Sequence, residues 1–309
     1  MQRKARKELN MNTIELEILE QLRSKFLQIS GREEDIFMNE ADASTTNCKY
    51  YLRDFKDNLQ SCETHLDDYS NKDKSENRWR VIPMGALRSS AALTYNILGD
   101  YNEVDVKIDS IEACKYWNIS SGKYKLQYEW KWKTINRSKA NIDAYLHDNK
   151  GNCHLFVEMK MLEPLTKSHP FEQEAYEKYT NEKNCPQRFI SAFEFFKTHK
   201  PEYFDAFQML KHLLAIYNYF KEKNFDKRQY VVLLNCHWEP KNQVVGDISL
   251  EKIYKKFDDT AALFEGMQVC FQELFDVFNV DLALAHCNHS DLKSIVGKVN
   301  DNYLERYEI

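Results

Sequence analysis

Glycine and proline are scarce in this chain, with 8 Gly and 6 Pro among 309 residues. This composition excludes collagen-like and Gly/Pro-rich low-complexity proteins. Long hydrophobic runs are also missing, because no stretch approaches the roughly 18 consecutive apolar residues of a membrane-spanning helix. Neither sign of charge dominates: 43 Lys and Arg stand against 48 Asp and Glu, for a net charge of −5. The protein therefore does not coat nucleic acid through bulk positive charge, although a local basic groove or a bound metal would still allow contact with DNA.

Several motifs are absent as well. The eight cysteines include no CxxC pair, and several lie in apolar runs, so we expect reduced thiols in a cytoplasmic protein. There is no P-loop, GxGxxG or HExxH sequence, which argues against nucleotide hydrolysis and zinc proteolysis. The basic start of the chain is followed by an acidic amphipathic run without an apolar segment or cleavage site, so no secretory signal is expected.

Enough apolar side chain is present for a sizeable core, since 43% of the residues are hydrophobic and 13% are aromatic. The helical spacing of Ile14, Ile18, Leu22 and Phe26 predicts an amphipathic helix over 12–28. Residues 31–79 are mostly polar. We therefore expect an N-terminal helical extension over 1–80 and an α/β domain over 81–309.

The predicted α/β domain opens with a helix over 89–98, for which Ser89 supplies the N-cap and Gly99 the C-terminal stop. Alternating or continuous apolar runs predict strands, and 3.6-residue periodicity predicts further helices. The strands are expected at 104–108, 124–132, 141–146, 153–161, 230–236 and 280–286, and the helices near 171–180, 187–198, 203–222 and 260–278. This order predicts a mixed sheet flanked by helices. The stripe of Phe207, Leu210, Leu214 and Tyr217 is expected to pack the long helix on the sheet.

The most informative segment is residues 140–165, ANIDAYLHDNKGNCHLFVEMKMLEPL. Asp143 lies on the first strand of a predicted hairpin, and Glu158 and Lys160 lie on the second. With a loop of two or four residues, Phe156 stands opposite Asp143. Because side chains alternate along a strand, Asp143, Glu158 and Lys160 then share one face, unless a bulge in the loop breaks the count.

Such a group has a definite chemistry. Two neighbouring carboxylates repel each other unless a cation lies between them, and one or two carboxylates suit Mg²⁺. The metal lowers the pKa of a bound water, while a nearby lysine orients that water or neutralises developing charge. This combination suits phosphodiester hydrolysis. The alternative is a hairpin whose charged residues simply face water.

The same residues resemble the active-site motif of the PD-(D/E)XK nuclease superfamily, whose order of elements also matches. The segments SSAALTYNILGD, YEWKW, ANIDAYL and FVEMKMLEP are similar to bacterial restriction-endonuclease-like proteins. The resemblance covers about 84–238 and leaves 1–80 and 250–309 unexplained. One departure is that Ile142, not proline, precedes Asp143. The resemblance implies a restriction-endonuclease-like fold and a Mg²⁺- or Mn²⁺-dependent endonuclease that acts on DNA.

It also implies roles for individual residues. Asp143 and Glu158 would bind the metal together with the carbonyl of Met159, and Lys160 would position the attacking water. Candidate accessory residues are Glu129, a further acid near the metal, and Gln208 and Lys211 on the long helix. The alternative for Glu129 is an ordinary polar residue on an alternating strand. The alternative for Gln208 and Lys211 is a helix face that simply contacts water. Candidates for a basic substrate groove are Lys131, Lys133, Arg137, Lys139, Lys167 and Lys211.

Two rival functions come from other classes. One is a non-catalytic module on the same scaffold that binds a partner protein. The other is a structural or regulatory α/β protein in which the hairpin acids are surface residues. Under the nuclease interpretation the expected partner is DNA, with no membrane, and the sequence is compatible with a homodimer.

Overall fold

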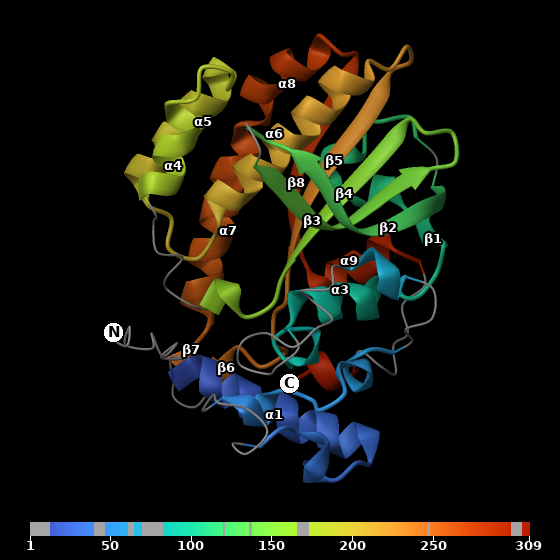
Figure 1. Cartoon of the computed structure of the whole chain (residues 1–309), viewed down its shortest axis with the longest axis vertical. Coiled ribbons are helices and arrows are strands. Elements are labelled where there is room, and N and C mark those ends of the chain that lie inside the picture. Colours follow the sequence, from blue (N-terminus) through green and yellow to red (C-terminus); the bar gives the residue numbers. More distant parts are fainter. Residues whose placement is uncertain are drawn as a thin grey trace, which may run out of the picture.

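A six-stranded mixed sheet forms the centre of the computed structural model, which describes residues 13–39, 47–60, 65–69, 83–119, 121–135, 138–165, 173–245, 248–297 and 305–309 (Figure 1). The strands follow the spatial order β1-β2-β3-β4-β5-β8. Their bounds are β1 Glu103–Val106, β2 Gly122–Lys133, β3 Lys139–Asp148, β4 Cys153–Lys160, β5 Gln229–His237 and β8 Val280–Asn288. β1 to β4 pair antiparallel, whereas β4, β5 and β8 are parallel. This is the mixed α/β sheet that the sequence predicts.

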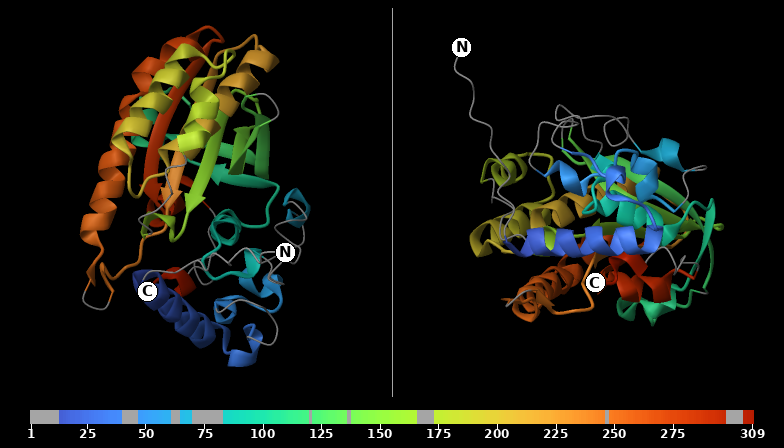
Figure 2. Two further views of the ribbon diagram at one scale, coloured as in Figure 1. Left: turned by 60° about the vertical axis from the view of Figure 1, so that its left-hand side comes forward. Right: turned by 90° about the horizontal axis from the view of Figure 1, so that it is seen from below.

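Helices cover both faces of the sheet and enclose two hydrophobic clusters (Figures 1 and 2). On one face lie α4 (Gln173–Thr180), α5 (Gln187–His199), α6 (Ala206–Lys223), α7 (Glu251–Gly266) and α8 (Gln268–Asp276). The other cluster contains α1 (Thr13–Ser30), α3 (Ser90–Leu98) and α9 (His289–Ile295). Two short strands, β6 (Val244–Val245) and β7 (Ile248–Ser249), form a separate pair.

The N-terminal helix α1 lies within two residues of its predicted bounds at each end. It buries Ile18, Leu19, Leu22 and Phe26 in the same cluster as α3. The proposed boundary at residue 80 falls at 70–82, outside the described residues. None of the described helices is long and apolar enough to cross a membrane.

Local signals place α3 as expected. The Ser89 hydroxyl accepts a hydrogen bond from the N–H of Ala92 at 3.1 Å, and Gly99 ends the helix with a φ of 79°. The predicted helix over 260–278 is wrong in its bounds, because two helices, α7 and α8, cover 251–276 and meet at Met267. Gly266 ends α7, and glycine is a poor helix former because its backbone loses the most entropy on folding.

α6 differs from the expectation in the direction of its stripe. The rings of Phe207 and Tyr217 pack against helices, with Tyr176 of α4 beside Phe207 and Phe275 of α8 beside Tyr217. The side that faces the strands includes Phe220, whose ring contacts His154 of β4 at 5.1 Å between centroids. α6 is buried on both sides because α4, α5 and α8 form a second layer over it, so its apolar residues extend beyond a single stripe.

The β3–β4 hairpin has a different register from the expected one. Tyr145 pairs with Phe156, so Phe156 does not stand opposite Asp143, and the ladder ends where Ala144 pairs with Val157. The cause is the loop, in which one Asp148 carboxylate oxygen accepts the N–H groups of Asn152 and Cys153. The register is shifted by two residues, which preserves the parity of the two strands.

Candidate active site at the end of the hairpin

Glu158 and Lys160 project from β4 toward α6. Residues 154 and 156 of the same strand belong to the interface with that helix, and side chains two apart share a face. Glu158 is 2% exposed and Lys160 is 8% exposed. The Lys160 ammonium donates to Oε1 of Glu158 at 2.8 Å. The two residues therefore form an ion pair that is almost fully removed from water.

Asp143 lies where β3 and β4 separate. The Met159 N–H donates to Oδ2 of Asp143 at 2.8 Å, just past the last paired residues of the hairpin. Because the N–H and C=O of one strand residue point to the same side, the Met159 carbonyl also faces β3. Asp143 therefore lies between the two strands and close enough to Glu158 and Lys160 for their charges to act on it.

Glu129 is opposite Asp143 in the β2–β3 register, between the pairs Tyr128–Ala144 and Trp130–Ile142. It has a φ of 53°, the left-handed region, which costs a non-glycine residue roughly 1–2 kcal/mol. Its buried carboxylate accepts a hydrogen bond from the Asn141 amide and lies 3.6 Å from the Lys131 ammonium. This strained backbone lies beside Asp143 of the candidate site, and backbone strain is common at functional positions.

Both strands change face at this level. Glu129 on β2 and Asp143 on β3 each divide their strand into two stretches. Even-numbered residues in the stretch nearer the β3–β4 loop pack beside α3, and those in the other stretch pack beside α6. The first set is Tyr124, Leu126, Tyr128, Ala144 and Leu146, and the second is Trp130, Ala140 and Ile142. The twist of the two strands thus brings Glu129 and Asp143 together at a break in the regular alternation.

The electrostatics of the site are dominated by carboxylates. Burial raises the pKa of Asp143, the Glu158 charge raises it further, and Lys160 only partly opposes them. Burial also raises the pKa of Glu158, but Lys160 and His212 outweigh it and hold that pKa at about 2. Glu129 adds to the unfavourable charge on Asp143. Ionised Asp143 therefore experiences a repulsion that a cation would relieve.

The donor set fits a hard divalent cation. Among the described residues, no group of three or more His, Cys, Asp and Glu side chains is already disposed to hold a metal. The buried carboxylate of Glu158, the half-buried carboxylate of Asp143 and a neighbouring carbonyl are nevertheless ligands of the kind that hold Mg²⁺, which keeps several of its own waters. Asp143, Glu158 and Met159 are the residues that would hold it.

The long helix supplies the accessory group that the sequence suggested. Gln208 donates its amide N–H to Oε1 of Glu158 at 2.7 Å and accepts from the Lys160 ammonium at 2.5 Å. It thus bridges both members of the ion pair. Lys211 is half-buried, and burial lowers its pKa, while Asp205 and Glu158 act in the opposite direction. The expectation of a purely solvated helix face is wrong for Gln208.

His212 is the site residue whose role the sequence did not reveal. It is 2% exposed, and its Nε2 lies 3.1 Å from Oε2 of Glu158. The signal that could have identified it is spacing, since residues four apart lie on the same face of a helix and Gln208 was already a candidate. Asp205, which caps α6 by accepting the Gln208 backbone N–H, also acts on Lys160.

The candidates for a basic groove have different surroundings. Lys131 and Lys139 are exposed on β2 and β3 near the site. Lys133 forms an ion pair with Glu222 of α6, which offsets its charge. Arg137 and Lys167 lie outside the described residues. A substrate-binding role for these side chains stays a prediction.

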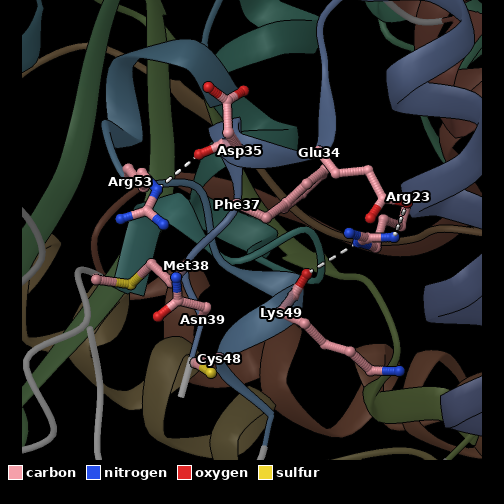
Figure 3. Close-up of a pocket in the computed structure, with 9 residues that line it drawn as sticks. All are labelled: Arg23, Glu34, Asp35, Phe37, Met38, Asn39, Cys48, Lys49 and Arg53. Atoms are coloured by element: carbon pink, nitrogen blue, oxygen red, sulfur yellow. Dashed lines mark hydrogen bonds and ion pairs between the residues drawn. The ribbon is translucent and has the colours of Figure 1, made fainter. Parts of the chain in front are cut away.

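Two cavities in the described structure are lined by other residues. One of about 420 Å³ lies beside α1, where Arg23 donates to the carbonyl of Lys49 and Arg53 to that of Asp35 (Figure 3). The other, of about 550 Å³, is lined by residues of β8 and α9, including His286 and Cys287. Neither includes Asp143, Glu158 or Lys160 in its lining.

Comparison with known proteins identifies a family. A family model described as restriction endonuclease associating with ARP matches residues 20–306. No curated protein and no solved structure matches the chain. Because the model covers nearly the whole chain, this protein belongs to that restriction-endonuclease family, in agreement with the resemblance of its motif.

Proposed function

From this family membership, we propose that the protein is a metal-dependent nuclease that hydrolyses DNA phosphodiester bonds. The observation that carries the proposal is the cluster of Asp143, Glu158 and Lys160 at the end of the hairpin, in which Gln208 bridges Glu158 and Lys160. Carboxylates that can hold a cation and an ammonium beside them are suited to phosphodiester hydrolysis. A nuclease also accounts for acids that are buried next to one another although their mutual repulsion is unfavourable.

Each residue has a distinct task. Asp143 and Glu158 would hold the cation, Mg²⁺ or Mn²⁺, which when bound lowers the pKa of water and offsets charge on the phosphate. Lys160 would orient the attacking water and donate to the oxygen on which negative charge develops. Gln208 holds the Lys160 ammonium and the Glu158 carboxylate in place through one side chain. Lys211 would contact a phosphate next to the scissile one.

A plasmid-cleavage assay tests this function. Supercoiled and linear DNA are incubated with the purified chain in Mg²⁺, Mn²⁺ or EDTA. We expect nicking or linearisation in either metal and none in EDTA. Asp143→Asn and Glu158→Gln should abolish cleavage, because each neutralises a carboxylate that the cation needs.

The matched control is Glu103→Gln, which makes the same chemical change at an exposed strand residue. It should cleave DNA at the wild-type rate. Cleavage that survives in both Asp143→Asn and Glu158→Gln would place the active site elsewhere. A wild-type chain that cuts no DNA in either metal would favour the non-catalytic module.

Binding of a protein partner is a second candidate function. The family description names an association with ARP, and three large apolar side chains are strongly exposed around α8. Leu263 is 51% exposed, Val269 76% and Val277 77%. If this surface contacts ARP, Val269→Lys with Val277→Lys should abolish co-purification of the two proteins and leave cleavage unchanged. Undiminished co-purification would exclude this surface.

A further inference from the structure

An imidazole and a carboxylate oxygen face each other in the site without the hydrogen bond expected between them. Nε2 of His212 and Oε2 of Glu158 are 3.1 Å apart, but their alignment does not make a hydrogen bond. Nδ1 of His212 also has no hydrogen-bond partner in the described structure. All three atoms are buried. A buried polar atom without a partner costs about 1–3 kcal/mol, so their clustering needs an explanation.

The other Glu158 oxygen is fully engaged. Oε1 accepts from the Lys160 ammonium and from the Gln208 amide, which leaves Oε2 as the oxygen that can take a further ligand. The His212 imidazole contacts that oxygen. A ligand at Oε2 would therefore meet the imidazole as well.

The separation of the two atoms fits a shared cation. Two adjacent ligands of an octahedral ion, each at 2.0–2.1 Å, lie about 2.9 Å apart. This value is close to the observed 3.1 Å. A ring nitrogen that is this close to the carboxylate oxygen but poorly aligned for a hydrogen bond can instead direct its lone pair to an ion bound beside both atoms.

We propose that His212 supplies a nitrogen ligand to the cation held by Glu158 and Asp143. This inference rests on the proposed function, because it concerns the same cation. The described structure holds the three side chains in a resting arrangement in which the Met159 N–H occupies one oxygen of Asp143. Binding of the cation then requires a side-chain adjustment around a ring that is already buried on α6.

A nitrogen ligand changes which divalent metals the site binds most tightly. Mg²⁺ prefers oxygen ligands, whereas first-row transition ions such as Mn²⁺ and Co²⁺ accept imidazole readily. A site made only of Asp143, Glu158 and a carbonyl would show a smaller preference for these ions over Mg²⁺ than a site that includes an imidazole. With His212 as a ligand, the site binds Mn²⁺ and Co²⁺ more tightly than Mg²⁺.

Pulsed electron paramagnetic resonance of Mn²⁺ bound to the full chain tests the assignment. A directly ligated imidazole gives a ¹⁴N coupling, which changes to the ¹⁵N pattern when the protein is labelled with ¹⁵N-histidine. We expect this coupling in the wild type and its loss in His212→Gln. The variant should also bind Mn²⁺ about tenfold more weakly, with a smaller change for Mg²⁺.

The control is His154→Gln, which changes a buried histidine of β4 that is hydrogen-bonded to Tyr145 and Gln229. It should keep the coupling, and the wild-type spectrum decides the question even if a variant fails to fold. Mn²⁺ that binds in a Glu158-dependent manner without a nitrogen coupling would overturn the role of His212 and leave the nuclease proposal intact. A chain that binds no Mn²⁺ at all would overturn both.

Discussion

Lys160→Met removes the one ammonium that donates to both Glu158 and Gln208. Burial lowers the pKa of Lys160, but the charges of Glu158, Glu163, Asp143 and Asp205 outweigh it and raise that pKa. The lysine is therefore charged at neutral pH. Methionine has a similar shape, so the change deletes the charge and leaves the packing largely intact.

The magnitude follows from the burial of the pair. Removing one partner of a buried ion pair costs about 3–5 kcal/mol, because the other charge is left without compensation. Gln208 and His212 still contact Glu158, so we expect the lower end, about 3 kcal/mol. For a chain of 309 residues this lowers the melting temperature by roughly 5 °C. A divalent cation should restore most of the loss by neutralising the carboxylates.

Thermal unfolding in EDTA and in Mn²⁺ measures this effect, with Lys123→Met, an exposed change on β2, as the control. The control should differ from the wild type by less than about 0.5 kcal/mol. In the cleavage assay, Lys160→Met should lose about 10²–10³ in rate, the value typical of a preorganised donor. A variant that melts with the wild type in EDTA and cleaves DNA at an undiminished rate would refute the account of Lys160.

Three further outcomes are expected. Because burial and Glu158 raise the pKa of Asp143, its ionised form destabilises the folded chain, so Asp143→Asn should melt higher than the wild type in EDTA; a lower melting temperature would contradict this. Burial lowers the pKa values of His154 and His237 to about 4 from 6.5, so the free energy of unfolding should fall as pH drops from about 6.5 to 4, by roughly 3 kcal/mol for each, and urea titrations that show no decline would exclude it. Gly99→Ala should lose about 1–3 kcal/mol, measured in the same titration, since Gly99 has a φ of 79° and a ψ of 177° and an added Cβ would lie 2.6 Å from the Tyr101 ring; an unchanged midpoint would show that the position tolerates a Cβ.

Local patterns were sufficient to predict most of the elements. Ser89 and Gly99 delimit α3 through side-chain and backbone requirements that are visible in the sequence itself. The alternation in β2 and the apolar runs of β4, β5 and β8 have a period that does not depend on distant contacts. The hairpin register was predicted wrongly by two residues. The predicted alternation of side chains was unaffected, because a shift of two residues leaves every side chain on the same face.

The remaining features depend on tertiary contacts. The hairpin register follows from Asp148 accepting two backbone N–H groups, a side-chain preference that alternation cannot show. The positive φ of Glu129 has no counterpart in its residue type, because glutamate rarely adopts it. In the sequence His212 is one polar position on an apparently exposed strip, and only the packing of α6 on β4 places it beside Glu158. The break between α7 and α8 was likewise indicated in the sequence only by Gly266.

The most direct test is anomalous diffraction from crystals of the chain soaked in Mn²⁺. We expect a single strong peak bonded to carboxylate oxygens of Asp143 and Glu158, beside the Lys160 ammonium, that disappears in Glu158→Gln. A crystal that binds Mn²⁺ only at other residues, from a preparation that cleaves DNA, would contradict the claim that these two carboxylates form the metal centre of the nuclease.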